Sequence, residues 1–230
     1  LQRAVDQIIE DVCLQNLHVI FAIDRAGLVG SDGETHQGCF DLSYLSMIPN
    51  MTVLAPKNKW ELSDMLKFAV RYQGPIAIRY PRGEAYDGLE EYREPMVYGK
   101  SELIFEGEET ALLSVGSMVE TAVEVREKLK ADKINATLVN ARFIKPLDTK
   151  ILDRLALKHK KIVTMEENVK NGGFGMAVSE YMQEYHPEVK VQIIALPDVF
   201  ITHGNPKLLK AKAGIDVDSI YGAIKEAEKR

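Results

Sequence analysis

One loop of the sequence brings together side chains that could transfer protons and bind an anion. It follows an apolar run, residues 18–23, and its four glycines separate charged and titratable residues: Asp24, Arg25, Asp32, Glu34 and His36. In open α/β sheets ligands bind at the carboxyl ends of strands, so residues 24–38 are the first candidate for a site. Glycines there would let a ligand approach the backbone closely. The alternative is a surface loop whose charges face water.

His36 is the candidate acid-base group of this loop. An imidazole with an ordinary pKa near ~6.5 can donate or accept a proton at neutral pH. Position alone supports a catalytic and a structural role for His36 equally. The remaining histidines lie at the ends of predicted elements and are more typical of solvated or helix-end residues: His18, His159, His186 and His203.

Two arginines could bind an anionic substrate. Arg25 and Arg82 each follow a predicted strand, so both could reach the same sheet edge. Two guanidinium groups at one point suit a phosphate or a carboxylate, because each offers permanently charged, bidentate donors. The alternative for Arg82 is an ion pair with Glu84 or Asp87, which are close in sequence.

Two further motifs favour a structural explanation. Glycines at 172, 173 and 175 precede a predicted helix and could bind phosphate, but the Rossmann spacing is absent and tight packing is the commoner reason for such glycines. Glu166 and Glu167 are adjacent at a strand end, so their side chains point in opposite directions. At most one of them is expected to face any given site.

The elements that position these residues alternate between strand and helix. This order predicts an α/β fold of two doubly wound domains, residues 1–90 and 91–230, each with a mostly parallel sheet and helices on both faces. Residues 83–99 lose periodicity and gain Gly, Pro, Tyr and acidic residues, which predicts a linker. Because Leu1 already lies in a helical pattern, we expect the first domain to lack its leading strand and the chain to be part of a longer protein.

The apolar periodicity gives these predicted elements. Strands are expected at residues 18–23, 51–55, 75–80, 100–105, 110–115, 136–139, 161–165 and 189–195. Helices are expected at residues 1–17, 40–48, 58–72, 119–131, 148–159, from about 175 to 185, 207–212 and 217–229. Asp148 and Thr149 are the expected caps of the fifth helix.

The composition describes an ordinary globular protein. Of the 230 residues 46% are hydrophobic and 27% charged, and the net charge of −5 argues against a nucleic-acid partner. Cys13 and Cys39 lack metal-site spacing, which indicates a reduced, cytoplasmic setting and no metal site. No run approaches the ~18 apolar residues of a membrane helix, and no signal-peptide pattern opens the chain, so no membrane partner is expected.

Several strings together resemble one enzyme family. They are Asp24-Arg-Ala-Gly27, Asp32-Gly-Glu-Thr-His-Gln-Gly38, Tyr80-Pro-Arg-Gly83, Arg142-Phe-Ile-Lys-Pro-Leu-Asp148, Glu166-Glu-Asn168 with Gly172-Gly173, and Leu196-Pro-Asp198. Their order and spacing resemble the C-terminal part of the 1-deoxy-D-xylulose-5-phosphate synthases, thiamine-diphosphate enzymes of the transketolase superfamily. The combination of the strings at 32–38 and 80–83 is specific to these synthases, whereas Lys-Pro-Leu-Asp and Glu-Glu-Asn are shared more loosely with relatives such as 2-oxoacid dehydrogenase beta subunits.

The resemblance implies a transferase that condenses pyruvate with glyceraldehyde 3-phosphate, releases carbon dioxide, and serves isoprenoid and thiamine biosynthesis. It also implies a homodimer that uses thiamine diphosphate and Mg²⁺. The diphosphate-binding domain and the start of the pyrimidine-binding domain, with its activating glutamate, would lie in a missing N-terminal region. The chain alone is therefore expected to bind no cofactor and to be inactive, and none of its residues is assigned to the cofactor.

The resemblance also implies roles for five residues. His36 would contact the donor carbonyl or the cofactor-bound pyruvate adduct, and Asp32 would meet an acceptor hydroxyl. Arg25 and Arg82 would hold the acceptor phosphate, and Arg3 would lie near the substrate. A different class of function stays open: a non-catalytic split transketolase-type subunit, or a 2-oxoacid dehydrogenase beta-type subunit, that completes a site on a partner chain.

Overall fold

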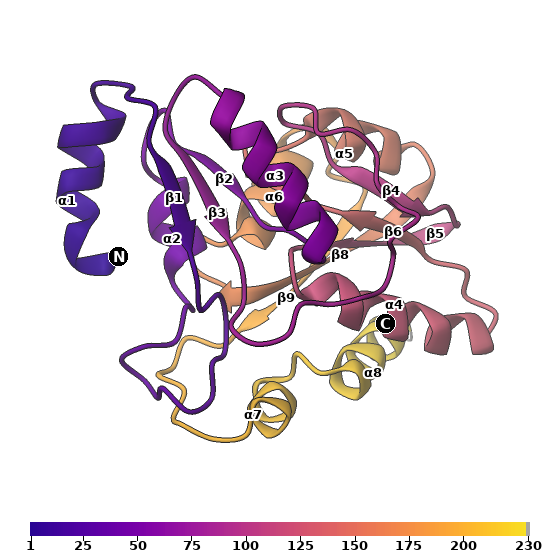
Figure 1. Cartoon of the computed structure of the whole chain (residues 1–230). Helices are drawn as coiled ribbons and strands as arrows, with labels where there is room; N and C mark the ends of the chain where they lie inside the picture. Colours follow the sequence, from indigo (N-terminus) through magenta and orange to yellow (C-terminus); the bar gives the residue numbers. More distant parts are fainter. Residues whose placement is uncertain (229–230) are drawn as a thin grey trace.

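The computed structural model describes residues 1–228 and contains two separate sheets (Figure 1). The first has the strand order β1 (Ile20–Ile23), β3 (Ile76–Arg79), β2 (Thr52–Leu54) and β7 (Phe143–Lys145). The second has the order β4 (Glu102–Phe105), β6 (Thr137–Asn140), β5 (Glu109–Ser114), β8 (His159–Val169) and β9 (Lys190–Leu196). Pairing is parallel except between β2 and β7 and between β4 and β6. The predicted α/β class with mostly parallel sheets is confirmed.

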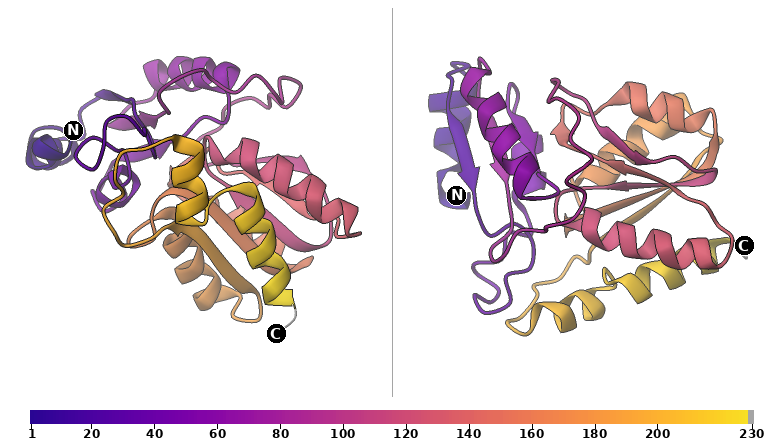
Figure 2. Two further views of the ribbon diagram at one scale, coloured as in Figure 1. Left: turned by 90° about the horizontal axis from the view of Figure 1, so that it is seen from below. Right: turned by 45° about the vertical axis from the view of Figure 1, so that its right-hand side comes forward.

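The N-terminal helical segment runs through three geometries: η1 (Gln2–Ala4), α1 (Val5–Gln7) and the π-helical η2 (Ile8–Cys13). The first sheet carries α2 (Asp41–Ser46) and α3 (Lys59–Arg71). In the second half, α4 (Met118–Ala131) and α8 (Val217–Glu228) cover one face of the sheet, and α5 (Thr149–Ala156) and α6 (Phe174–Tyr185) cover the other (Figure 2). The last helix before α8 is α7 (Pro206–Ala213). Residue 229, the expected end of the last helix, lies outside the described residues.

Helix ends follow the capping chemistry of the sequence. The Asn58 side chain accepts a hydrogen bond from the Glu61 N–H at the start of α3, and Asp148 accepts one from Ile151 at the start of α5. Asp148, one of the two residues expected to cap this helix, is therefore its N-cap.

The first sheet differs from expectation at both of its edges. Residues 143–145 have no predicted strand and fall within the predicted second domain, but they form β7, which pairs with β2 of the first sheet, with Val53 opposite Lys145. β1 was expected to be buried, yet its residues are partly exposed, because within residues 1–228 it pairs with β3 on one side only. An apolar run is compatible with an edge strand, so periodicity could not separate the two cases.

The core is continuous between the two halves. Leu42 and Leu45 of α2 are fully buried and share one apolar cluster with Val53 of the first sheet and Leu113 of the second. β7 contributes Ile144 to the same cluster. Burial of these side chains supplies the non-directional attraction between the halves.

A buried cluster of charges supplies directional contacts between the two halves. Lys57, just before α3, and Glu61, in its first turn, meet Glu102 and Arg142 from the second half. All four side chains are at most 3% exposed. Lys57 Nζ lies 2.6 Å from Glu102 Oε2, and Arg142 contacts Glu61 at 2.7 Å and Glu102 at 2.5 Å. Asn140 donates to Glu61 at 2.9 Å. Two positive and two negative charges balance, which is what burial of ions requires.

We expect Arg142→Met to destabilise the fold because it leaves Glu61 and Glu102 facing Lys57 alone. Removal of one partner of a buried ion pair typically lowers the free energy of unfolding by about 3–5 kcal/mol. Urea denaturation of the full protein measures the loss. Arg154→Met is the matched control, since Arg154 pairs with Glu106 on the surface with both side chains about half exposed. Its expected effect is within ~1 kcal/mol; equal losses for both variants would contradict the role of the buried cluster.

Candidate active site

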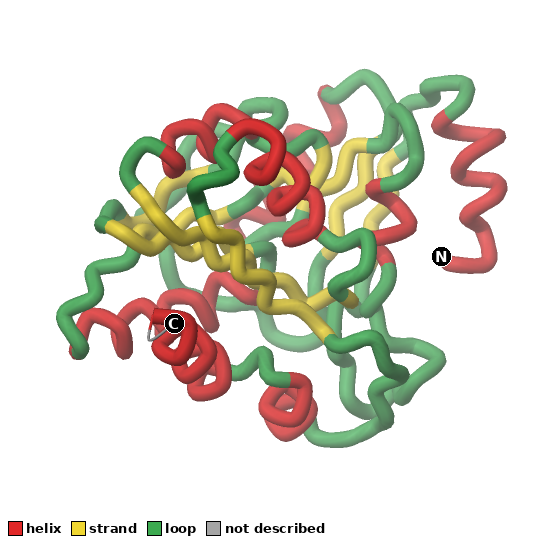
Figure 3. Tube along the Cα trace, turned by 180° about the vertical axis from the view of Figure 1, so that it is seen from behind, coloured by secondary structure: helices red, strands yellow, loops and turns green. Residues whose placement is uncertain are grey.

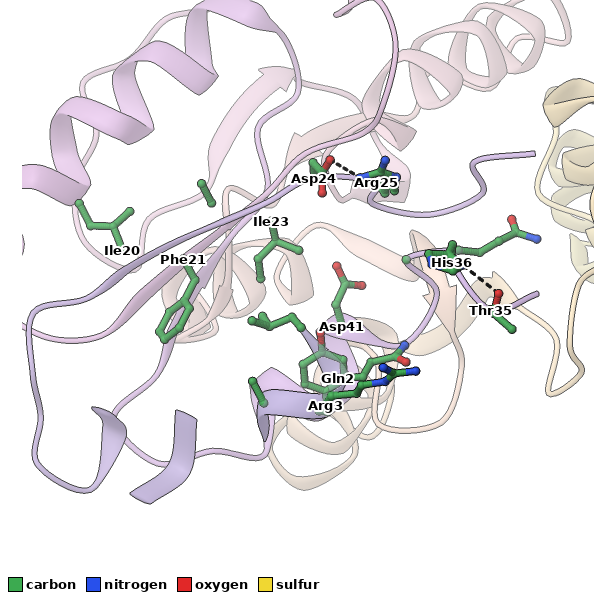
Figure 4. Close-up of a pocket in the computed structure, with 16 residues that line it drawn as sticks. Gln2, Arg3, Ile20, Phe21, Ile23, Asp24, Arg25, Thr35, His36 and Asp41 are labelled. Carbon is green, nitrogen blue, oxygen red and sulfur yellow. Dashed lines mark hydrogen bonds and ion pairs between the residues drawn. The ribbon is translucent and has the colours of Figure 1, made fainter. Parts of the chain in front are cut away.

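A cavity of about 810 Å³ lies along β1 (Figure 4). Its walls come from the chain start, from β1, from the loop after β1 and from α2. Phe21 and Ile23 give it an apolar side, while Arg3, Arg25 and His36 give it a polar one. The structure thus brings three of the five predicted site residues to one cavity.

The loop of residues 24–38 closes on itself at its base. Gly27 and Gly38 exchange backbone hydrogen bonds of 2.8 and 3.0 Å. A Cβ atom on Gly38 would lie 2.1 Å from the Arg25 carbonyl oxygen, so only glycine permits this neck. Arg25 itself has φ = +59°, a sparsely populated conformation for a residue with a side chain. Backbone strain of this kind is concentrated at functional sites.

Asp32 joins the two arginines. Its Oδ2 accepts from Arg25 Nε at 2.9 Å and its Oδ1 accepts from Arg82 Nη1 at 2.8 Å. The hydrogen bond from Arg25, with smaller contributions from Ser31 and Arg82, lowers the pKa of Asp32. Arg25 and Arg82, 57 positions apart in sequence, therefore converge on one carboxylate of the protein itself.

The alternative prediction, that Arg82 pairs with Glu84 or Asp87, is wrong. Asp87 pairs with Lys59 instead, and Arg82 reaches back to Asp32 in the loop after β1. Asp32 and Arg82 do not themselves line the cavity and connect to it through Arg25.

His36 is exposed at the cavity, and its Nδ1 lies 2.8 Å from the Thr35 hydroxyl. Because Nδ1 makes this contact, the other ring nitrogen, Nε2, is the one available to a ligand. Among the remaining histidines His159 differs from expectation: it is 4% exposed and contacts Thr137 Oγ1 and the Leu155 carbonyl.

A carboxylate of the protein itself, that of Glu166, occupies the start of α6 after the glycine-rich segment. Glu166 accepts hydrogen bonds from the N–H groups of Phe174 at 2.9 Å and Gly175 at 2.8 Å. A carboxylate already satisfies the helix N-terminus, which supports packing over phosphate binding there. Burial raises the pKa of Glu166 to about 7, although these two N–H groups and Arg79 oppose the shift.

Glu167 points the opposite way, toward the candidate loop. Its Oε1 accepts from the Leu28 N–H at 2.7 Å, and a Cβ on Gly27 would lie 2.3 Å from its carboxyl carbon. Three residues that hold the loop carry no predicted role: Gln37, Arg79 and Glu167. Gln37 stands inside a motif, but the carbonyls to which its side chain donates lie more than 160 positions away. No local pattern marks Arg79.

Residues 1–228 offer neither a metal-binding cluster nor a membrane-spanning helix. No group of three or more His, Cys, Asp or Glu side chains in residues 1–228 could hold a metal ion. No helix in the same part of the chain has the length and apolar character needed to span a membrane.

The family can now be assigned. The sequence model for "Transketolase, pyrimidine binding domain" matches residues 1–87, and the one for "Transketolase, C-terminal domain" matches residues 99–220. The chain belongs to the transketolase family. The loop, the cavity and Arg82 lie in the pyrimidine-binding part, and Glu166 and Glu167 lie in the C-terminal part.

Relatives confirm the resemblance found in the motifs. The chain is 56% identical over 97% of its length to the 1-deoxy-D-xylulose-5-phosphate synthase of Lachnoclostridium phytofermentans, and 49% identical over its whole length to that of Desulforudis audaxviator. It spans 36% of the length of each of these relatives.

Two solved structures share the fold. One is described as "Split gene transketolase, inactive beta4 tetramer" and matches with a TM-score of 0.87 and 29% identity, over 98% of this chain and 71% of that one. The other, the transketolase of Campylobacter jejuni, has a TM-score of 0.77 and 18% identity over 98% of this chain and 34% of its own, and it supports the fold alone.

The raised pKa of Glu166 predicts a pH dependence of stability. Its pKa of about 7 in the fold lies above the ordinary 4.5, so the folded state binds the proton more tightly. This contribution to stability is fully present below about pH 4.5 and is lost as the pH rises through about 7.

Glu166→Gln removes this titration. We therefore expect the difference in urea midpoint between wild type and variant to change across this pH window. Glu180→Gln, an exposed position on the same helix, is the control. A difference that stays constant with pH would show that Glu166 does not titrate near neutrality.

Proposed function

We propose that this chain is the C-terminal part of a thiamine-diphosphate-dependent 1-deoxy-D-xylulose-5-phosphate synthase. The full protein condenses pyruvate with glyceraldehyde 3-phosphate and releases carbon dioxide, serving isoprenoid and thiamine biosynthesis. The identity to relatives of that name over nearly the whole chain supports this proposal. The structural observation that carries it is the convergence of Arg25 and Arg82 on the Asp32 carboxylate beside the His36 cavity.

The arginine pair is the proposed site for the acceptor phosphate. Arg82 contacts Asp32 and Ser31 through Nη1, so its other guanidinium N–H groups remain to bind a phosphate oxygen within the described part of the chain. Asp32 holds both guanidinium groups in place and, from its partly buried position, accepts a hydrogen bond from an acceptor hydroxyl. Arg3, exposed at the cavity, adds positive charge near the substrate.

His36 is the proposed acid-base group. With Nδ1 at the Thr35 hydroxyl, Nε2 donates or accepts the proton at the donor or acceptor oxygen. Thiamine diphosphate, when bound, supplies the carbanion chemistry of this enzyme class.

The remaining machinery is proposed to lie outside this chain. A preceding region of the same protein would hold the diphosphate and Mg²⁺ and would cover the open edge of β1. We propose two domains, residues 1–90 and 91–230, and a cytoplasmic homodimer. The isolated chain would bind no cofactor and would be inactive.

A second candidate is a split transketolase-type subunit that completes a site on a partner chain. The structure described as "Split gene transketolase, inactive beta4 tetramer" favours it, because that protein aligns with 98% of this chain. The 56% identity to a 1-deoxy-D-xylulose-5-phosphate synthase of which this chain spans only 36% favours the first candidate. Turnover restored by a separately encoded partner, but not by the continuous chain, would select the second.

In the full-length protein, Arg82→Ala is expected to raise the Michaelis constant for glyceraldehyde 3-phosphate by about tenfold or more and to leave that for pyruvate nearly unchanged. The reason is loss of a charge-assisted hydrogen bond to the phosphate, worth roughly 1.5–3 kcal/mol. Steady-state kinetics with each substrate varied in turn measure both constants.

Two controls make this test specific. Unphosphorylated glyceraldehyde has no phosphate to lose, so Arg82→Ala should hardly change its use. Arg93→Ala removes another exposed arginine, one that pairs with Asp64 and does not line the cavity. Equal losses with both aldehydes would mean that Arg82 holds the loop and not the phosphate.

His36→Ala in the full-length protein is expected to lower turnover by about 10²–10⁴-fold, the usual loss for an acid-base group. Cofactor affinity should not change, because His36 is proposed to act on the substrate oxygen. Single-turnover kinetics and calorimetry with thiamine diphosphate measure the two quantities. Near-normal turnover would reduce His36 to a structural residue of the loop.

A further inference from the structure

The loop that carries Arg25, Asp32 and His36 is held from the C-terminal half of the chain. We name residues 24–38 the acceptor loop and residues 197–205, between β9 and α7, the strap. The two run side by side in Figure 1 and, from behind, in Figure 3. Gly204 N–H donates to the Gly30 carbonyl at 3.0 Å, which joins the tip of the acceptor loop to the strap.

Gln37 makes the main connection. Its side chain is 5% exposed, and its Oε1 accepts from the Val29 N–H at 3.2 Å, across the acceptor loop. Its Nε2 donates in the other direction, to the carbonyls of Ile201 at 2.6 Å and Thr202 at 3.3 Å. A side-chain amide is suited to this position because it accepts on one side and donates twice on the other.

Glu167 fixes the other end of the same loop. Its Oε1 accepts from the Leu28 N–H, while its Oε2 lies 3.1 Å from Lys210 Nζ of α7 and 3.2 Å from the Ser117 hydroxyl. The carboxylate is buried, with its side chain 4% exposed. One side chain of β8 therefore ties the acceptor loop to the helix that follows the strap.

Arg82 is not part of this connection. It follows β3 and reaches Asp32 from a separate segment, so the phosphate site has one arginine on the acceptor loop and one outside it. The distance between the two guanidinium groups depends on where the loop lies. Since catalysis and binding are sensitive to displacements of about 1 Å, the contacts that fix the loop also set the geometry of the site.

We infer that Gln37 and Glu167 are positioning residues through which the C-terminal half sets the separation of Arg25 and Arg82 and thereby the selectivity for a phosphorylated acceptor. This inference rests on the proposed function. It gives the C-terminal half a role in acceptor recognition, although none of its residues up to 228 lines the cavity.

The test uses the full-length protein with Gln37→Glu. This substitution keeps the size and the acceptor for Val29 but points a carboxylate oxygen at the Ile201 and Thr202 carbonyls. A milder variant is Lys210→Met, which leaves Glu167 without its ion pair. Its control is Lys207→Met, an exposed lysine on the same helix.

Two quantities are measured. The first is the ratio of kcat/KM for glyceraldehyde 3-phosphate to that for unphosphorylated glyceraldehyde, which is insensitive to a loss of folded protein. It should fall about tenfold in Gln37→Glu, the size expected for one displaced charge-assisted contact, less in Lys210→Met, and not at all in Lys207→Met. The second is amide hydrogen exchange, which should rise in peptides covering residues 24–38.

The outcomes separate the two proposals. An unchanged ratio in Gln37→Glu, or unchanged exchange in the acceptor loop, overturns the positioning role. Faster exchange with equal losses for both aldehydes overturns it as well, because the loop would then support folding only. If the wild-type protein does not prefer the phosphorylated aldehyde, the proposed function fails, while the exchange data still decide whether Gln37 holds the loop.

Discussion

The balanced charges of Lys57, Glu61, Glu102 and Arg142 fix how the two sheets meet. Hydrophobic contacts through α2 attract the two halves but would tolerate small shifts, since burial of apolar surface is not directional. A buried ion pair does not tolerate such shifts, because a displaced partner leaves a desolvated charge uncompensated. Each half supplies one cation and one anion, and the ion pairs Lys57–Glu102 and Arg142–Glu61 join one half to the other. The second sheet is thereby held in one orientation against the first.

That orientation brings the end of β8 against three segments of the molecule. Glu166 accepts from the start of α6, Glu167 from the acceptor loop, and Asn168 from the Leu42 N–H of α2. Consecutive strand residues alternate in direction, which lets three neighbours serve three different segments. The length of β8, which exceeds the predicted strand by four residues at its end, is what carries these side chains so far. The candidate site thus depends on a strand of the other half.

The sequence was sufficient where the determinants are local. Helix periodicity, the Asp148 cap and the position of the acceptor loop after a strand all depend on neighbours within a few residues. It was insufficient where the partner is remote. Val53 and Lys145 pair 92 positions apart, so no local pattern could assign β7 to the first sheet. The ion pair between Arg82 and Asp32 was not predicted for the same reason. Acidic residues close to Arg82 in sequence were the expected partners, but Asp32 is the one that lies close to it in space.

The charges at the proposed phosphate site form surface ion pairs that an incoming anion could displace. Asp24 and Asp32 offset Arg25 and Arg82, so the group carries no net formal charge before an anion arrives. Asp32 is 20% exposed and the arginines about half exposed, which keeps the ion pairs weak enough to rearrange. The same pairs orient the guanidinium groups, so binding of the proposed phosphate would cost less side-chain freedom. The orientation of the two arginines therefore comes from the carboxylates of Asp24 and Asp32. The position of the loop that carries Arg25 comes from buried contacts with the C-terminal half.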